Sequence, residues 1–217
     1  MRRLAPLLAL ALFAPPGASR AADPLIAPVH QVAPDQAPWR ELATALRARG
    51  AVTAAFTENR WFPFRKAPTV LHGEVRISAG RGLSLHYFGP PERTVIIDER
   101  GLLVRSAEGD IVPPADPRTA AANFALLHVL RLDLPPLAAA FDIYGLSAGS
   151  AWRLALVPRG EAMRRSLGRI ELEGDGGAVR RIELRRSASQ RVEILVAPAL
   201  PAAAFTGDEL RRFFRAP

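Results

Sequence analysis

The sequence predicts a mainly β protein with a few helices, an α+β fold built on an antiparallel sheet. Two observations support this prediction. Apolar residues recur at every second position in many short segments, which is typical of strands with one apolar face. Three other segments have apolar residues at helical spacing. Together they predict about eleven strands and three helices.

The clearest strand pattern runs from residue 69 to residue 110. Turn residues at 80–82, 89–91 and 98–101 divide it into four short strands, which form an antiparallel meander. The expected register pairs Ile77 with Leu83, Val75 with Leu85 and Gly73 with Tyr87. The opposite face is polar and should be exposed to water, as in a sheet covered on one side; it carries His72, Glu74, Arg76, Ser84 and His86.

The N-terminus has the features of a secretory signal peptide over residues 1–21. Arg2 and Arg3 precede an apolar run that ends at Phe13, and Ser19 and Ala21 stand at the −3 and −1 positions of a cleavage site. The run is shorter than the ~20 residues that span a bilayer. We therefore expect cleavage and export of a soluble, monomeric protein to the periplasm.

The chain has 217 residues, of which 49% are hydrophobic, enough for one domain with a core. It has no cysteine, which excludes disulfides, thiol catalysis and a lipid-modified N-terminal cysteine. The formal charge of +8 falls to about +5 once Arg2, Arg3 and Arg20 are removed. This basicity is compatible with an anionic membrane surface, an acidic partner or simply a solvated face, whereas no aromatic-rich basic tract predicts nucleic-acid binding.

The remaining elements follow in chain order. A Pro-rich, extended lead-in is expected over residues 22–38, and the folded domain over residues 39–217. Helices are predicted at 39–49, 117–130 and 134–140, the second with Ala120, Phe124, Leu127 and Leu130 on one stripe. The loop 62–68 has two prolines and two phenylalanines and is expected to fold over a sheet edge or an opening. The further strands are predicted at 51–60, 111–112, 141–147, 151–158, 167–173, 180–186 and 190–196, with a last helical turn around Phe213 and Phe214.

These elements leave apolar sheet without a helical cover. Eleven strands of ~17 Å at ~4.8 Å spacing offer roughly 900 Å² on one face. Three helices of about 34 residues cover roughly 500 Å². The sheet therefore curls and packs against itself, is covered by a partner, or encloses an apolar ligand.

No catalytic constellation is present, so we expect a protein that is not an enzyme and has no cofactor or metal. His72, Glu74 and His86 resemble a metal site only loosely and fit a cross-strand cluster better. His128, near Asp133, fits a capping or surface role better than a catalytic one. No Gly-x-Ser-x-Gly motif occurs. Glutamates alternate with arginines from residue 171 to residue 193, as on a solvated face with paired charges.

The pattern of the meander resembles that of the LolA-like family of outer-membrane lipoprotein carriers. The similar segments cover most of the chain after the signal peptide; they are Phe56-Thr57-Glu58, Gly73–Ile77, Leu83–Tyr87, Pro90 or Pro91, Val95–Asp98, Leu102–Val104 and Trp152–Pro158. The order of helix, strands, helices and strands also agrees.

This resemblance implies an incomplete antiparallel β-barrel of about eleven strands, with helices as a lid over an apolar concavity. It implies a periplasmic chaperone that takes acylated lipoprotein or lipid cargo from an inner-membrane exporter and passes it to an outer-membrane acceptor. The sequence departs from the family at Glu58, usually Gln; at Ser84, usually an Arg that latches the lid through backbone carbonyls; and at Leu85, usually Trp.

The predicted lipid-binding residues are the apolar residues of the concave face and two from the lid. They are Val75, Ile77, Leu83, Leu85, Tyr87, Ile170, Leu172, Ile182, Leu184, Phe124 and Leu127. Two alternatives remain open at this stage. A lipid-sensing regulatory module of the same fold would carry an added C-terminal domain, and a lipid hydrolase would need a nucleophile with a base in reach.

Overall fold

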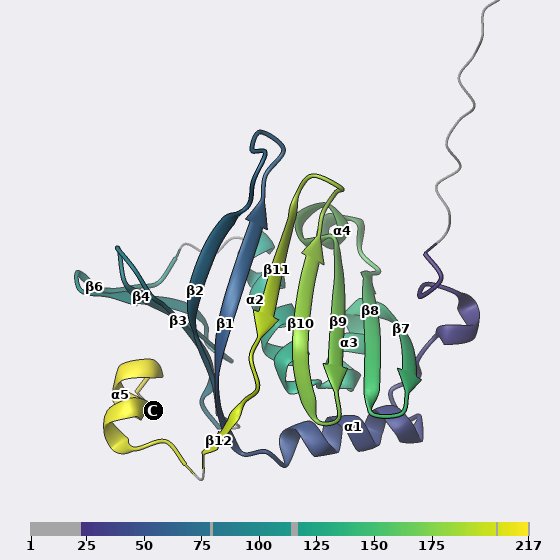
Figure 1. Cartoon of the computed structure of the whole chain (residues 1–217), viewed down its shortest axis with the longest axis horizontal. Coiled ribbons are helices and arrows are strands. Elements are labelled where there is room, and N and C mark those ends of the chain that lie inside the picture. The colour runs from purple at the N-terminus through teal and green to yellow at the C-terminus, as the bar shows by residue number, and fades with distance from the viewer. Residues whose placement is uncertain (1–22, 79, 114–116, 203, 217) are drawn as a thin grey trace, which may run out of the picture.

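A single antiparallel sheet dominates the computed structural model, which describes residues 23–78, 80–113, 117–202 and 204–216 (Figure 1). The predicted signal peptide, residues 1–21, lies outside these residues. The strands run in the order β6-β5-β4-β3-β2-β1-β11-β10-β9-β8-β7, and β12 pairs with the start of β1. The sheet does not close into a barrel, so the incomplete barrel is confirmed.

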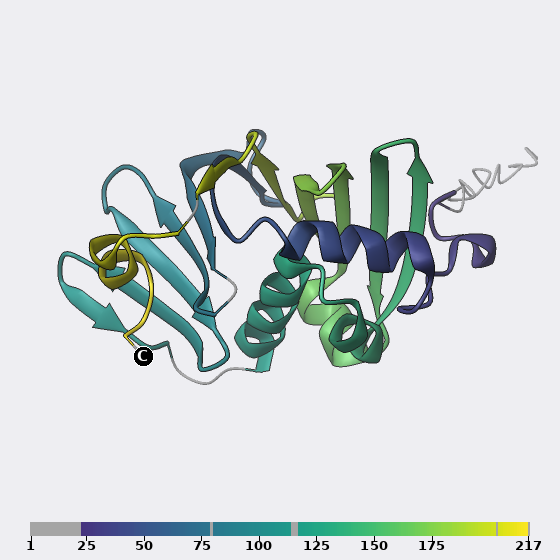
Figure 2. The same ribbon diagram turned by 90° about the horizontal axis from the view of Figure 1, so that it is seen from below.

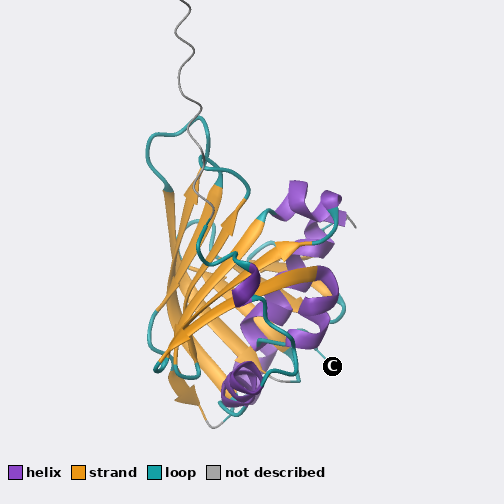
Figure 3. Cartoon of the chain, turned by 90° about the vertical axis from the view of Figure 1, so that its right-hand side faces the viewer, coloured by secondary structure: helices purple, strands orange, loops and turns teal. Residues whose placement is uncertain are grey.

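The strands follow the alternating segments of the sequence closely. Their bounds are β1 Ala51–Trp61, β2 Thr69–Ser78, β3 Gly82–Tyr87, β4 Arg93–Asp98, β5 Gly101–Ser106, β6 Gly109–Ile111, β7 Phe141–Ala148, β8 Ala151–Pro158, β9 Arg169–Asp175, β10 Ala178–Arg185, β11 Arg191–Val196 and β12 Leu200–Ala202. Figure 3 shows them as a curved wall. Strand β12 was not predicted.

The register of the β2–β3 hairpin is the expected one. Ile77 pairs with Leu83, Val75 with Leu85 and Gly73 with Tyr87. Gly73 is required there, because a Cβ atom would lie 2.2 Å from the carbonyl oxygen of His86 and 2.7 Å from the ring of Phe56. The missing side chain allows the Phe56 ring to pack edge-on against Tyr87, with 5.3 Å between ring centroids.

Four helices lie on the concave side of the sheet (Figure 2). They are α1 Ala37–Arg47, α2 Pro117–Arg131, α3 Leu134–Ala140 and α4 Glu161–Leu167. The core between them and the sheet is closely packed: Leu154 and Leu172 from the strands and Leu132 and Leu137 from the helical layer have no exposed surface. Helix α4 was not predicted, and Leu167, expected to begin a strand, is its last residue.

The predicted lead-in is more ordered than an extended segment. A short 3₁₀ helix, η1, spans Pro28–His30, and Gln31 forms a β-bridge with Tyr144 of β7. The Val32 amide donates a 2.8 Å hydrogen bond to the carbonyl oxygen of Ile143. Leu25 and Val32 are buried. Apolar side chains therefore anchor this Pro-rich segment along the β7 edge.

The polar face of the meander is not exposed to water as predicted, because helix α5, Gly207–Phe213, covers part of it. Figures 1 and 2 show α5 apart from the other helices, beside β3–β5. The guanidinium carbon of Arg76 lies 3.6 Å from the centre of the Phe213 ring, and the His86 and Phe213 rings are 5.3 Å apart. Arg76, Ser84 and His86 are buried as a result. The prediction failed because the covering residues lie more than 120 positions later in the chain.

Three arginines of the meander hold α5 through its backbone. Arg105 donates from Nη1 to the carbonyl oxygens of Arg211 at 2.7 Å, Arg212 at 3.0 Å and Phe214 at 3.2 Å. Arg81 and Arg100 donate to the carbonyl oxygens of residues 215 and 216. The bonds to Arg211 and Arg212 satisfy carbonyls that the end of a helix leaves without partners, and the others hold the residues after α5. They fix the C-terminal segment, in which the Phe214 ring has no exposed surface and lies 5.4 Å from the Phe205 ring.

On the convex face of β8–β11, charged residues pair across the strands. Arg181 binds Glu193 at 2.7 Å and Glu173 at 3.2 Å and also pairs with Glu183. Glu183 is 1% exposed and pairs with Arg185 as well. Burial by itself raises the pKa of the Glu183 carboxyl, but the hydrogen bond from Arg185 and the nearby positive charges outweigh burial and hold the pKa below 4.5.

We predict that Phe214→Ala destabilises the fold by about 3 kcal/mol, because it removes a fully buried ring that packs beside Phe205 at the end of α5. Urea unfolding measures the change. Leu200→Ala, at a position 72% exposed, is the matched control and should cost well under 1 kcal/mol. Equal stability of the two variants would contradict the described packing of α5.

Glu183→Gln should lower the free energy of unfolding at neutral pH, because it removes the negative charge that pairs with Arg181 and Arg185. The loss should be about 1–2 kcal/mol, since both arginines are partly exposed and water screens the ion pairs. The pKa of Glu183 is lower in the folded protein than in the unfolded chain. The stabilisation of the fold by the Glu183 carboxylate is therefore complete above about pH 4.5, and it is lost as the pH falls through the folded-state pKa. Urea unfolding at a series of pH values should show the two proteins converging in acid. A difference that stays constant from neutral to acid pH would exclude this role.

Candidate functional site

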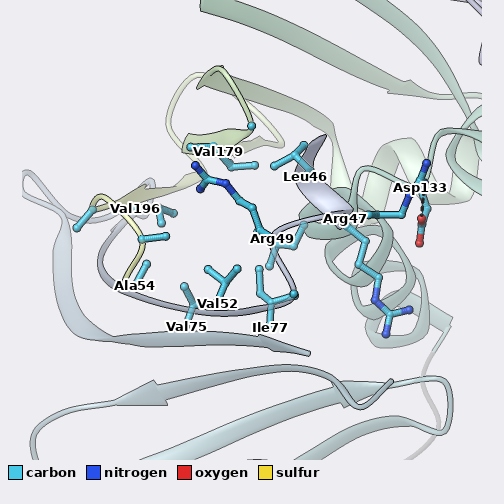
Figure 4. Close-up of a pocket in the computed structure, with 17 residues that line it drawn as sticks. Leu46, Arg47, Arg49, Val52, Ala54, Val75, Ile77, Asp133, Val179 and Val196 are labelled. Atoms are coloured by element: carbon cyan, nitrogen blue, oxygen red, sulfur yellow. Dashed lines mark hydrogen bonds and ion pairs between the residues drawn. The ribbon is translucent and has the colours of Figure 1, made fainter. Parts of the chain in front are cut away.

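The candidate site is a cavity at one end of the concave face, where α1 ends and β1 begins (Figure 4). Its volume is about 260 Å³. The walls come from β1, β2, β10, β11, α1 and α2, elements that are distant in sequence but adjacent in the sheet or packed on it. The apolar lining comprises Leu46, Val52, Ala54, Val75, Ile77, Leu130, Ala178, Val179, Val196, Ala197 and Ala199.

Strand alternation explains why these side chains converge. Val52 pairs with Ile77 and Ala54 with Val75, so all four point to the concave face. Phe56, two residues further along β1, pairs with Val196 of β11. Gly50, with φ of +67°, ends the α1 segment and turns the chain into β1. The small Ala54 and the end of α1 leave a space that neither the helix nor the sheet fills.

Charged groups stand among the apolar lining. Arg47, Arg49 and Arg131 supply three guanidinium groups and Asp133 one carboxylate. Arg47 pairs with Asp133 at 3.4 Å, and Arg131 with Glu99 at 3.0 Å. Arg49 is exposed and extends beside the cavity in Figure 4. The cavity therefore combines an apolar floor with a net positive border, which suits an acyl chain attached to a polar or anionic group.

A second polar cluster lies on the same concave face, further along β1. The Tyr87 hydroxyl donates a 2.6 Å hydrogen bond to Glu58, which is 3% exposed and also pairs with Arg60. Burial, together with the charge and hydrogen bond of Glu58, raises the pKa of Tyr87 well above its usual 10.0. The phenol is therefore neutral at physiological pH and acts as a hydrogen-bond donor. Glu58, at the position where the family usually has Gln, has a structural partner in Tyr87.

Of the eleven residues predicted to bind lipid, Val75 and Ile77 line the cavity. The others belong to the packed core or lie against it: Leu83, Leu85, Tyr87, Leu127, Ile170, Leu172 and Ile182 are buried, and Phe124 and Leu184 are half-buried. All nine strand residues share the concave face, as expected. Their role in binding lipid stays a prediction.

Ser84, at the position where the family usually has its latch arginine, does not face α1–α4. Ser84 pairs with Arg76 and Ile96 on the convex face and is fully buried there, on the side of the sheet opposite α1–α4. Successive strand residues point to opposite faces, so Leu85 rather than Ser84 points towards the helices.

The histidines have ordinary structural partners. His72 lies 3.2 Å from the Thr57 hydroxyl across the β1–β2 pair, and His86 lies 3.0 Å from that of Thr94. His128 pairs with Asp133 at 3.3 Å. Within the described residues, no group of three or more His, Cys, Asp and Glu side chains is arranged to hold a metal ion.

Much of the cavity lining was not predicted from the sequence, including Leu46, Val179 and Val196. Val52 and Ala54 could have been predicted, because they lie at alternate positions of β1 and share the face of Phe56. The position of the cavity depends on where α1 ends above the sheet, and periodicity does not contain that information.

No protein-family model matches the sequence, and no curated protein matches it either. Several solved structures are similar. The complex of Pseudomonas aeruginosa MucA and MucB matches with a TM-score of 0.46 and 17% identity, over 80% of this chain and 59% of that chain. This chain thus spans about three fifths of the MucB structure.

Two further structures carry the family description expected from the sequence. A LolA superfamily protein from Nitrosomonas europaea matches with a TM-score of 0.39 and 7% identity, over 79% of this chain and 96% of that chain. An outer membrane lipoprotein-sorting protein domain from Vibrio parahaemolyticus matches with a TM-score of 0.37 and 8% identity, over 79% and 95%.

Proposed function

We propose that this protein is a periplasmic carrier that binds the acyl chain of a lipoprotein or another lipidated molecule and moves it towards the outer membrane. The observation that carries the proposal is the apolar cavity between α1 and the β1–β2 and β10–β11 strands. This space remains although the neighbouring core over β8 and β9 is closely packed. The resemblance of the meander to lipoprotein carriers supports the same function.

Binding would depend on burial of methylene groups, each contributing about 0.8 kcal/mol. At about 260 Å³ the cavity is slightly below the range of roughly 300–1,000 Å³ usual for ligand sites, so it suits part of one acyl chain. Such binding needs no specific polar contact with the chain. Release then requires only a competing apolar surface on the acceptor.

The arginines at the border would bind the polar end of the cargo. A guanidinium group donates several hydrogen bonds in one plane and suits ester, carboxylate or phosphate oxygens. Arg49 is the best placed, since Arg47 and Arg131 already pair with carboxylates. An inner-membrane exporter would supply the cargo and an outer-membrane acceptor would receive it, and the carrier would act as a monomer without catalysing a reaction.

We predict that Val52→Phe lowers the affinity for a fluorescent fatty acid at least tenfold, because the larger side chain occupies the cavity floor. Fluorescence titration measures the affinity. Val70→Phe, a matched change on the convex face where the side chain is 48% exposed, should bind like the unmodified protein. Full affinity in a folded Val52→Phe variant would show that the cavity is not the binding site.

Arg49→Gln should weaken binding of a fatty acid about three- to tenfold, since it removes a charge-assisted hydrogen bond to the carboxylate. Its effect on the methyl ester of the same acid should be smaller, because the ester has no negative charge. Competition titrations with both ligands test this difference. Equal losses for acid and ester would exclude a charge interaction at Arg49.

A further inference from the structure

The loop between β1 and β2 carries an apolar tip that the fold does not use. Phe62 and Phe64 stack on each other, with 5.5 Å between centroids and 19° between ring planes. Phe64 is 81% exposed, so the prediction that this loop folds over an edge or opening is wrong. Figure 1 shows the loop rising beyond the neighbouring β10–β11 loop. An exposed aromatic pair of this kind marks an interaction surface.

The structure holds this tip in a defined shape. Pro63 and Pro68 restrict the loop backbone, and Arg65 donates a 2.6 Å hydrogen bond from Nη1 to the Thr69 hydroxyl. At the base of the hairpin, the guanidinium carbon of Arg191 lies 4.1 Å from the centre of the Trp61 ring. The two rings are therefore presented on a supported hairpin, at low entropic cost for binding.

Positive charge surrounds the aromatic tip. Residues 59–71 contain Arg60, Arg65 and Lys66 and no acidic residue, and Lys66 is the only lysine of the chain. The adjacent β10–β11 segment, residues 184–192, contains three arginines and no acidic residue. Its Arg191 pairs with Trp61 in the β1–β11 ladder, which places the two segments side by side. Arg60 and Arg185 pair with the buried Glu58 and Glu183, while Arg65 and Lys66 remain exposed.

We propose that the β1–β2 loop docks the protein on an anionic phospholipid bilayer, with the Phe62–Phe64 pair entering the interface and the surrounding arginines and Lys66 binding the headgroups. Aromatic rings favour the membrane–water interface, and basic residues beside them are attracted to anionic leaflets. A purely apolar protein partner would not require the charge, and an acidic protein partner would not require the stacked rings. Docking through this loop would be peripheral and reversible. No helix among the described residues is long and apolar enough to cross a membrane.

Vesicle co-sedimentation tests the proposal with the mature chain, which starts at residue 22 after the predicted cleavage of the signal peptide. The probes are phosphatidylcholine vesicles with and without phosphatidylglycerol. We expect binding to the vesicles that contain phosphatidylglycerol, weakened by high salt. Phe62→Ser/Phe64→Ser should weaken it at least tenfold, and Arg65→Gln/Lys66→Gln about tenfold.

Matched controls lie elsewhere on the surface. Leu200→Ser removes an exposed apolar side chain, and Arg40→Gln/Arg211→Gln removes two exposed charges, and both should bind vesicles like the unmodified protein. The loop variants should keep fatty-acid affinity, which separates this proposal from the carrier function. Equal binding to both kinds of vesicle, no binding to either, or unchanged binding by the folded Phe62→Ser/Phe64→Ser variant would overturn it.

Discussion

Burial of the concave face of the sheet is the constraint on which the rest of the structure depends. Every long strand contributes apolar side chains to this face, and the helices are too short to cover all of it evenly. Over β8 and β9 the helices bury the face, and Leu154, Ile170 and Leu172 have almost no exposed surface. Towards β4–β6 the cover thins, and Ile111 is 56% exposed. The cavity lies between these regions, where α1 ends above β1 and β2.

The convex face is stabilised in two different ways along the same sheet. Over β2–β5 it is covered by α5, which buries polar residues such as His86 and Arg76 together with Phe213 and Phe214. Burial lowers the pKa of His86 below 6.5, and the charges of Arg212 and Arg76 act in the same direction while Glu92 opposes them. Over β8–β11 ion pairs replace the helix, with Arg181 joining three glutamates. The convex face of β2–β5 is thus covered by a helix, whereas that of β8–β11 is formed by paired charged residues.

The sequence predicted what depends on neighbouring residues. Alternation gave the strands, and the turn lengths gave the pairing of Val75 with Leu85, because a shift of one residue would reverse both faces. The sequence pattern did not predict α4, because its seven residues are too few to show a clear helical period. The burial of Ser84 and the lining of the cavity by Val179 and Val196 depend on contacts between distant segments. Local patterns do not encode those contacts. The apolar face of the sheet could therefore be predicted from the sequence, whereas the cavity on that face could not.

The bridge between Gln31 and Tyr144 has a consequence for the borders of the sheet. An open border strand presents unpaired amides and carbonyls to which a strand of another molecule can add. The β7 border is partly occupied, since Gln31 and Val32 already pair with it. The β6 border is limited in another way, because Gly109–Ile111 offers only three residues for pairing. A chain with so much β-structure is thereby protected at both borders from growing into an intermolecular sheet.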